Sequence, residues 1–372
     1  MKYTVLHGAK ENCGDFLIRD AAINFLTYHA DMSRDSIHTV EVVRNKISEE
    51  EIKKIESTDA AFLAGGPGYR QKFYPEVYPA LYKIFEVTTV VPLGSGWKGS
   101  NEDTYTFTQK SINILNKIAG QSRVPFLGAR DLPSVRILRN HGLPAELTGC
   151  PGWYHYNGFP PNPTFPANPD VETILVSTPP QNNLQYLTQY IFLIRMLAAE
   201  FPDATITLIF HRGQQDRAFT PVIGRPWRSQ TWKDNVSSVV YGIINQISQD
   251  EQFNRHDPSG SSEYAELYYN ADLHVGYRVH AHIPSLSAGT PSFLLQIDGR
   301  GTGVSESLGT NADVFAGDGL RAPVQEIMKH ITSSRRTEFS DFDVVGENIQ
   351  TGYENMKRLV RESTRFHLPT SR

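Results

Sequence analysis

The sequence has few cysteines, almost no net charge and no long apolar run, and each shortage excludes a class of protein. Two cysteines among 372 residues cannot form a disulfide framework or a cysteine-rich metal site. The 36 Lys and Arg residues against 40 Asp and Glu give a net charge of −4, and this balance lacks the excess of positive charge that is typical of nucleic-acid-binding proteins. No apolar run approaches the ~20 residues of a membrane helix, and the first residues do not resemble a secretory signal. We therefore expect a cytoplasmic protein with no transmembrane segment and no nucleic-acid partner.

Several common catalytic patterns are also missing. The sequence has no GxSxG hydrolase motif and no HExxH zinc motif. It has no GxGxxG followed by an acidic residue at the dinucleotide spacing, so NAD is not indicated. We expect neither a metal nor a cofactor.

What the sequence does contain is a repeated alternation of short apolar runs and helical stretches. Tyr3–His7 and Ala60–Ala64 are typical of buried strands. Ser48 with Glu51 forms a capping box that opens a helix, and Gly289 is placed to end another. Short apolar strands separated by helices predict parallel sheets covered on both faces.

A proline-rich stretch interrupts this alternation. Six prolines fall within residues 151–170, which excludes regular helix or central strand there. We interpret it as a linker between a domain at 1–150 and a second at 171–335, with a C-terminal helix and tail at 336–372. The fold class is α/β, with two Rossmann-like domains facing a cleft.

The densest candidate site is the segment 276–282, where a predicted strand passes into a helix. Ligands bind at such positions because loop amides and the helix N-terminus converge there. Arg278 would grip a carboxylate or phosphate, and His280 would transfer a proton near neutral pH. The alternative is an arginine paired with a carboxylate and a histidine that satisfies a helix end. His274 and His282 are expected to be structural.

A glycine-rich segment follows the next predicted strand. Gly299 and Gly301 would let the backbone approach an anion and donate amides to it as a nest, with Arg300 beside them. Glycine-rich turns are common, so this signal alone is weak.

Three further segments lie at predicted strand ends. Asn12 and Asp15 flank the start of the first helix, where Asp15 alone suggests a helix cap. Gly66 lies in a strand-end turn. Arg212 opens a loop rich in Arg and Trp that suits a sugar, although a solvated surface loop explains it equally well.

Four segments in order resemble the polysaccharide pyruvyl transferase family. Residues 12–18 resemble its N-x-G-D-x-L-I opening, and residues 64–68 its glycine turn. Residues 130–134 match R-D-x-x-S before a helix. Residues 264–297 resemble a helix, A-D, a strand, R-x-H, a helix, G-x-P and a strand, and they contain Arg278 and His280.

The resemblance implies a GT-B-like fold in which C-terminal helices cross back onto the first domain. It implies pyruvate transfer from phosphoenolpyruvate to sugar hydroxyls, with the first domain on the acceptor side and the second on the donor side. The R-x-H residues Arg278 and His280 would belong to the active site. The acceptor would be a saccharide, and whether it is free, polymeric or lipid-linked stays open.

The chemistry of phosphoenolpyruvate assigns roles to these candidates. His280 would act as the acid–base residue, because it is the type whose pKa lies near neutral pH. Arg278, Arg212 and Arg300 would neutralise carboxylate and phosphate, while Gly299 and Gly301 would donate amides. Asn12, Asp15 and Gly66 complete the candidate substrate-binding residues.

Two rival functions remain open from the sequence. A GT-B glycosyltransferase that uses a nucleotide-sugar would share the fold. A non-catalytic, two-lobed sugar-binding protein is the second, although such proteins usually act outside the cytoplasm.

Overall fold

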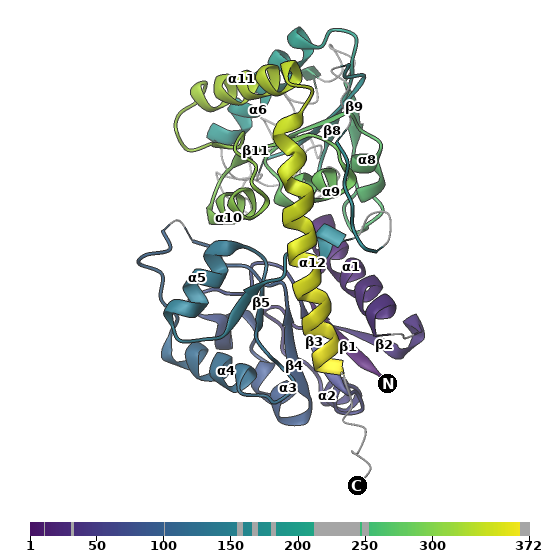
Figure 1. The fold of residues 1–372 in the computed structure, drawn as a ribbon, viewed down its shortest axis with the longest axis vertical. Helices are drawn as coiled ribbons and strands as arrows, with labels where there is room; N and C mark the ends of the chain where they lie inside the picture. The colour runs from purple at the N-terminus through teal and green to yellow at the C-terminus, as the bar shows by residue number, and fades with distance from the viewer. Residues whose placement is uncertain are drawn as a thin grey trace, which may run out of the picture.

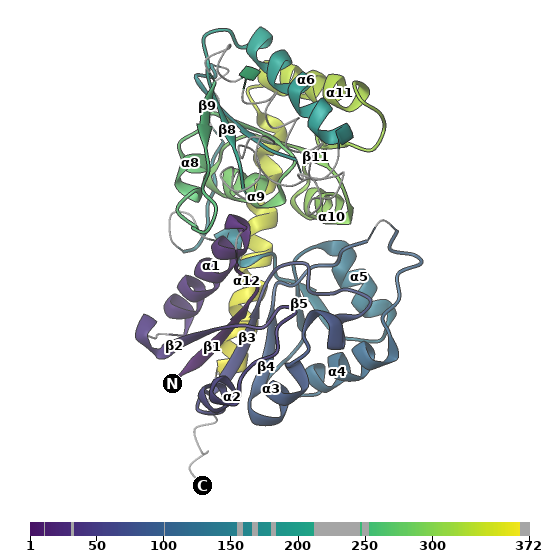
Figure 2. The ribbon, with the colours of Figure 1, turned by 180° about the vertical axis from the view of Figure 1, so that it is seen from behind.

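The computed structural model describes residues 1–10, 12–30, 33–99, 101–154, 159–165, 170–179, 184–211, 246–247 and 253–364. These residues form two lobes, each built around a parallel sheet, with helix α12 running along both (Figure 1). Seen from behind, helix α1 of the first lobe reaches up to the second (Figure 2). No helix within these ranges is long and apolar enough to cross a membrane.

The first lobe is an alternation of strands and helices. In chain order it contains β1 (Tyr3–His7), α1 (Cys13–His29), β2 (Ile37–Glu41), α2 (Glu49–Glu56), β3 (Ala60–Ala64), α3 (Leu81–Val87), β4 (Thr89–Leu93), α4 (Gln109–Ala119), β5 (Leu127–Ala129), α5 (Leu132–Asn140) and β6 (Ala145–Leu147). Its main sheet has the order β2-β1-β3-β4, and β5 and β6 form a second parallel pair. Successive side chains of a strand point to opposite faces. Phe62 therefore joins the core shared with α1, while Leu63 joins the core shared with α2, α3 and α4.

The second lobe repeats this pattern. It contains β7 (Thr173–Ser177), α6 (Leu184–Glu200), β8 (Thr205–Ile209), β9 (Asn254–His256), α8 (Ala265–Tyr269), β10 (Leu273–Gly276), α9 (Val279–Ala288), β11 (Ser292–Gln296), α10 (Gly299–Leu308), β12 (Val314–Phe315), α11 (Ala322–Arg336) and α12 (Asp343–Thr364). The described strands pair in parallel in the order β12-β11-β10-β7-β8-β9. All their carboxyl ends therefore lie at one edge of the sheet. The α/β class with parallel sheets is confirmed.

Helix α12 joins the lobes. Near its start, Asn348 donates from Nδ2 to the carbonyl of Leu308 in the second lobe, at 3.0 Å. Farther along, Asn355 donates from Nδ2 to the carbonyl of Leu147 in the first lobe, at 2.9 Å. The expected crossing of a C-terminal helix back onto the first domain is confirmed (Figure 1).

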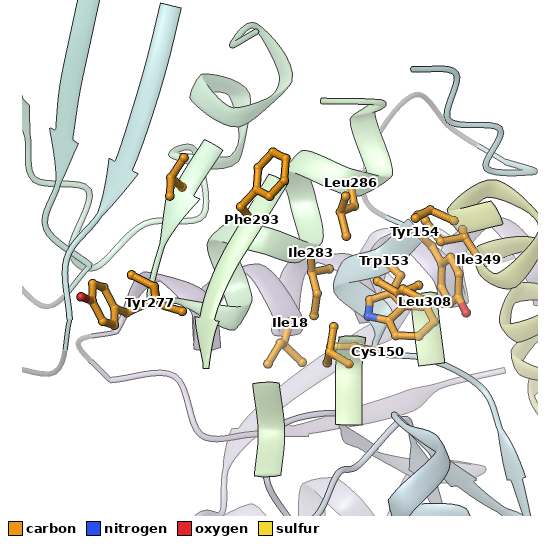
Figure 3. Close-up of a cluster of buried hydrophobic side chains, with 14 of the residues drawn as sticks. Ile18, Cys150, Trp153, Tyr154, Tyr277, Ile283, Leu286, Phe293, Leu308 and Ile349 are labelled. Atoms are coloured by element: carbon orange, nitrogen blue, oxygen red, sulfur yellow. The ribbon is translucent and has the colours of Figure 1, made fainter. Parts of the chain in front are cut away.

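The lobes also share an apolar core at their junction. Ile18, Cys150 and Trp153 of the first half of the chain are at most 3% exposed. They gather in one cluster with Ile283 and Leu308 from the helices of the second lobe (Figure 3). Burial of such side chains contributes roughly 1.5–3 kcal/mol each. The relative position of the lobes is therefore set by close packing.

Local signals in the sequence are found where they were expected. The Ser48 hydroxyl accepts from the amide of Glu51, and the Glu51 carboxylate accepts from the amide of Ser48. Gly289 ends α9 with φ of 84°. Between β6 and β7 the described residues contain one short 3₁₀ turn, Pro151–Tyr154, and no strand. The domain limits themselves stay a prediction.

Two glycines of α12 make a matched test of the packing against the first lobe. A Cβ at Gly352 would lie 2.7 Å from the hydroxyl of the buried Tyr154, which donates to the carbonyl of Thr148. At Gly346 the nearest atom would be the carbonyl oxygen of Pro163, at 3.4 Å. Alanine improves helix propensity by about 1 kcal/mol at either position. We expect Gly346→Ala to raise the melting temperature. Gly352→Ala should lower it, because overpacking costs about 1–3 kcal/mol. Equal shifts would contradict this account.

Candidate functional site

The segment that connects β10 to α9 is fixed against the neighbouring strand. Gly276 has φ of 154°, and a Cβ there would lie 2.3 Å from the hydroxyl of Ser177 at the end of β7. Only glycine fits this close approach. The tight turn places Arg278 at the N-cap of α9 and His280 in its first turn, at the carboxyl edge of the sheet.

Arg278 is held by the backbone that follows β7. Its Nε donates to the carbonyl of Thr178 at 2.8 Å, and its Nη2 donates to the carbonyl of Pro179 at 2.9 Å. These two bonds fix the plane of the guanidinium beside the first turn of α9. The cation that the sequence placed at this strand end is therefore held in one orientation.

His280 contacts the first lobe. A Cβ at Gly14, in the first turn of α1, would lie 2.7 Å from both Cβ and Nδ1 of His280. The side chain can therefore occupy its place only because residue 14 is glycine. The Nε2 atom of His280 is buried and has no hydrogen-bond partner within the described part of the chain. An unsatisfied buried nitrogen of this kind needs a ligand or water to bond.

A second unsatisfied group comes from the loop after β5. Arg130 is fully buried and pairs through Nη2 with Asp131 at 2.9 Å. Its guanidinium lies against Gly96, where a Cβ would be 2.4 Å from Cζ. The Nη1 atom is buried without a partner among the described residues. Burial of a guanidinium with an unused donor is costly, so this group is suited to an anionic ligand.

Sequence reasoning missed this role for Arg130. Asp131 caps α5 by accepting from the amide of Ser134 at 3.0 Å, and the amide of Leu132 donates to Ser307 of α10 at 2.8 Å. The sequence shows the R-D-x-x-S pattern but gives no sign that α10 covers it. The signals that the sequence offers for Arg130 are the R-D-x-x-S pattern and its place next to the N-cap residue at a strand end.

Burial and the neighbouring arginines keep His280 unprotonated. Burial is the main cause that lowers the pKa of His280 from 6.5 to about 3, and the positive charges of Arg130, Arg300 and Arg278 contribute to the same shift. In the ligand-free protein His280 is therefore neutral at pH 7. The expected pKa near neutral pH is not found in this state. The site combines a neutral imidazole with several fixed positive charges.

The glycine-rich segment differs from the expected loop. Residues 299–308 form helix α10, capped by Asp298, whose carboxylate also binds the guanidinium of Arg300 at 2.8 Å. The amide of Gly299 donates to the carbonyl of Gly99 at 2.8 Å, and that of Gly301 to the carbonyl of Asp298 at 3.0 Å. Both amides are therefore used, and an open nest is not formed. The assignment of Gly299, Gly301 and Arg300 to substrate binding stays a prediction.

The remaining candidates lie at the ends of the first strands. Asn12 is the N-cap residue of α1 without a side-chain cap bond, and Asp15 lies inside the first turn instead of capping it. The charge of Asp15 acts on Tyr78 of the first lobe and on Tyr264 of the second, so it faces the junction. A Cβ at Gly66 would have no other atom of the described residues within 4 Å. Their substrate-binding roles stay predictions.

One candidate cannot be placed, and two histidines have structural surroundings. Arg212 and the Arg- and Trp-rich loop after it lie outside the described residues. His274 and His282 are fully buried, and the Nδ1 atoms of both bond the hydroxyl of Ser292. Their surroundings fit the structural role expected of them.

Comparisons with known proteins agree on family and architecture. The model of the polysaccharide pyruvyl transferase family matches residues 12–299. No curated protein matches the sequence. Among solved structures, S. aureus MnaA in a structure with UDP has a TM-score of 0.56 at 11% identity, and the match covers 97% of this chain and 95% of that one.

Two further structures show the same likeness. The UDP-GlcNAc 2-epimerase from Neisseria meningitidis, bound to UDP-GlcNAc, has a TM-score of 0.52 at 13% identity, with 98% of this chain and 99% of that chain covered. The UDP-GlcNAc 2-epimerase from Methanocaldococcus jannaschii also has a TM-score of 0.52, at 11% identity, covering 97% of this chain and 100% of that chain. At such low identity the likeness shows the fold alone, and the expected GT-B-like architecture is confirmed.

The protonation of His280 can be measured directly. We expect its imidazole nitrogens to give the NMR signals of the neutral form down to pH 5, because its pKa is about 3. Removing a neighbouring cation in Arg300→Gln should raise that pKa. The His280→Gln protein identifies the signal. A protonated His280 at pH 6 in the ligand-free wild type would contradict this environment.

Proposed function

The chain belongs to the polysaccharide pyruvyl transferase family, and we propose that it transfers pyruvate from phosphoenolpyruvate to two hydroxyls of one sugar, forming a ketal and releasing phosphate. The family match supports pyruvyl transfer to a polysaccharide. We extend this to the donor and the product on the chemistry of the residues at the junction of the lobes. The reaction is proposed to take place in the cytoplasm and to need no cofactor.

The observation that carries the proposal is the pair of unsatisfied nitrogens, Arg130 Nη1 from the first lobe and His280 Nε2 from the second. Phosphoenolpyruvate carries a carboxylate and a phosphate on one small carbon skeleton. Arg130 and Arg278 offer two fixed guanidinium groups, and Arg300 acts on the same histidine. Guanidinium groups bind both anions through paired hydrogen bonds. The imidazole is then the proton carrier beside them.

The reaction balances without an oxidant or a metal. A proton adds to the methylene carbon of the donor, which creates cationic character at the adjacent carbon. The first sugar hydroxyl attacks that carbon, the bond from carbon to the phosphate oxygen breaks, and the second hydroxyl closes the ring. The two sugar hydroxyls lose one proton each. One of these protons balances the proton added to the methylene carbon, and the other is carried away by the released hydrogen phosphate.

Donor binding would allow His280 to take up a proton from water. Burial, together with the charges of Arg130, Arg300 and Arg278, holds the imidazole neutral. A bound trianion would offset these charges and raise the pKa of His280, so that it takes up a proton. The imidazolium then donates to the methylene carbon, and the imidazole that results accepts the hydroxyl proton. Donor binding and activation of the acid are in this way one event.

The rival functions make different demands on the protein. A nucleotide-sugar glycosyltransferase would be stabilised against heat by a UDP-sugar and would release no phosphate from phosphoenolpyruvate. A non-catalytic sugar-binding protein would release none with any acceptor. Phosphate release with phosphoenolpyruvate, screened against galactosides, glucosides and N-acetylmannosaminides, therefore tests the proposal against both.

The role of His280 predicts a specific defect. His280→Gln should keep the melting temperature and the affinity for phosphoenolpyruvate but reduce phosphate release by about 10²–10⁴-fold, because glutamine cannot donate a proton near neutral pH. Calorimetry at pH 6 in buffers of different ionisation enthalpy should show proton uptake with donor binding in the wild type and none in the variant. His330→Gln, on α11, is the matched control. Near-normal phosphate release from folded His280→Gln protein would remove His280 from the mechanism.

The contact between Gly14 and His280 gives a second test. In Gly14→Ala the added methyl group must displace His280, since it would lie 2.7 Å from the imidazole Nδ1. Phosphate release should fall by about 10²-fold, the effect of a displacement of roughly 1 Å in a reacting group. Gly152→Ala is the control, because its methyl group would meet Leu17 at an ordinary 3.5 Å. Loss of activity in the control, or full activity of Gly14→Ala, would contradict the assignment.

A further inference from the structure

Three adjacent strands of the second-lobe sheet carry buried polar side chains on one face. Ser292, His274 and Ser177 lie on β11, β10 and β7. Residue 274 is the register partner of residue 292, and Ser177 is that of the next residue on the same face of β10. The following residues Phe293 and Val275 point to the opposite face, where they join the apolar core that includes the side chains of α6. The buried polar groups must therefore satisfy one another.

Hydrogen bonds join these groups into one chain that reaches Arg278. The hydroxyl of Ser292 lies 2.8 Å from Nδ1 of His282, on α9, and 2.6 Å from Nδ1 of His274. The other ring nitrogen of His274, Nε2, lies 3.0 Å from the hydroxyl of Ser177. The backbone amide of Arg278 donates to that same hydroxyl at 3.3 Å. A continuous path of hydrogen bonds therefore runs from the buried side of α9 to the residue at its N-cap.

A buried carboxylate lies at the far end of this path. The side chain of Asp313 is 1% exposed, and its Oδ2 atom lies 3.5 Å from Nε2 of His282. The carboxylate accepts from the amide of Leu294 and from the hydroxyls of Thr310 and Ser305, which fix its position. At 3.5 Å the contact with His282 is too long for a strong hydrogen bond. The negative charge nevertheless favours a hydrogen on the imidazole nitrogen that faces it.

The partners determine the direction of every bond in the chain. Burial lowers the pKa of both His274 and His282, and in His282 it outweighs the opposite effect of Asp313, so each imidazole carries one hydrogen at pH 7. With its hydrogen on Nε2, His282 accepts at Nδ1 from the hydroxyl of Ser292. That hydroxyl has no second hydrogen, so His274 donates to it from Nδ1. The bare Nε2 of His274 then accepts from Ser177, whose oxygen is left to accept from the backbone amide at the N-cap.

The chain acts on Arg278 through the end of β7. The hydroxyl of Ser177 accepts from the backbone amide of Arg278, and the carbonyls of the next two residues, Thr178 and Pro179, accept from its guanidinium. A hydroxyl group can rotate, and a hydrogen turned toward the amide would repel it. By accepting that hydrogen, His274 keeps the oxygen of Ser177 available to the amide. The backbone that holds the guanidinium is thereby fixed to the turn from which the arginine comes.

We propose that His274 is a positioning residue for Arg278, which it aligns through Ser177 so that the guanidinium can bind an anionic group of the donor. The inference rests on the proposed function, because it takes Arg278 to bind phosphoenolpyruvate. His274 itself is fully buried and acts only through its neighbours. A network that merely stabilised the sheet would contribute to the melting temperature and leave donor binding unchanged.

Calorimetry on matched variants separates positioning from stability. His274→Leu has a side chain of similar size that cannot accept from Ser177, and it should weaken phosphoenolpyruvate binding about 10-fold, roughly the effect of one lost hydrogen bond to a charged group. In the Arg278→Ala protein the same change should have no further effect, because both residues act through one contact. His274→Gln, whose amide oxygen can accept from Ser177, should retain most of the affinity.

The structural control is Thr290→Val. The buried hydroxyl of Thr290 donates to two carbonyls just beyond the carboxyl end of α9, away from the N-cap. Its loss should lower the melting temperature without changing the affinity for phosphoenolpyruvate. If His274→Leu does not fold, Ser292→Ala takes its place, because it interrupts the same chain between the two histidines.

NMR of the ligand-free protein adds measurements that need no donor. At pH 7 we expect the hydrogens on Nδ1 of His274 and Nε2 of His282. The Nε hydrogen of Arg278 should exchange with water faster in His274→Leu than in the wild type, because its bond to the carbonyl of Thr178 is loosened.

The outcomes distinguish this inference from the proposed reaction. A hydrogen on Nε2 of His274, unchanged donor affinity in His274→Leu, additive effects of that change and Arg278→Ala, or an equal loss of affinity in Thr290→Val overturns the inference. A wild type that binds no phosphoenolpyruvate, or releases no phosphate from it, rejects the proposed reaction. The ring hydrogens of the two histidines and the exchange rate at Arg278 still decide the positioning role in that case.

Discussion

The apolar junction between the lobes is the contact on which the site depends. Ile18 and Trp153 pack with Ile283 and Leu308 from the other lobe, and all of them are buried (Figure 3). This packing brings α1 against α9, so that His280 lies over Gly14. Well-packed interiors transmit displacement and do not absorb it. The position of His280 relative to Gly14 therefore depends on the apolar packing between the lobes.

The junction also contains an electrostatic conflict. Arg130 is buried with a single carboxylate partner, and its charge adds to those of Arg278 and Arg300 around a neutral imidazole. A folded protein holds such like charges together only when surrounding structure fixes them. The carbonyls of the β7 loop and the N-cap of α5 do so here. The positive charges at the junction are therefore fixed in position by the fold itself.

Much of the fold follows from local signals, and much of the site does not. The capping box at Ser48 and the stop at Gly289 act within a few residues, so the sequence predicts them correctly. The position of Arg278 at a strand end follows from the same local pattern. The meeting of Gly14 with His280 joins residues far apart in the chain, and no periodicity encodes it. The glycines after Asp298 suggest an anion nest, but tertiary packing uses them for close approach within a helix.

Helix α12 has a consequence for how the protein is made on the ribosome. The first lobe emerges well before α12, and domains generally fold in order of synthesis. Until α12 follows, the carbonyl of Leu147 lacks the Asn355 amide, and the core that contains Phe62 lacks the apolar side chains of α12. A nascent chain therefore exposes an incomplete first lobe throughout synthesis of the second. Completion of the junction between the lobes is coupled to synthesis of α12, so a stalled or truncated product exposes apolar surface that chaperones and proteases recognise.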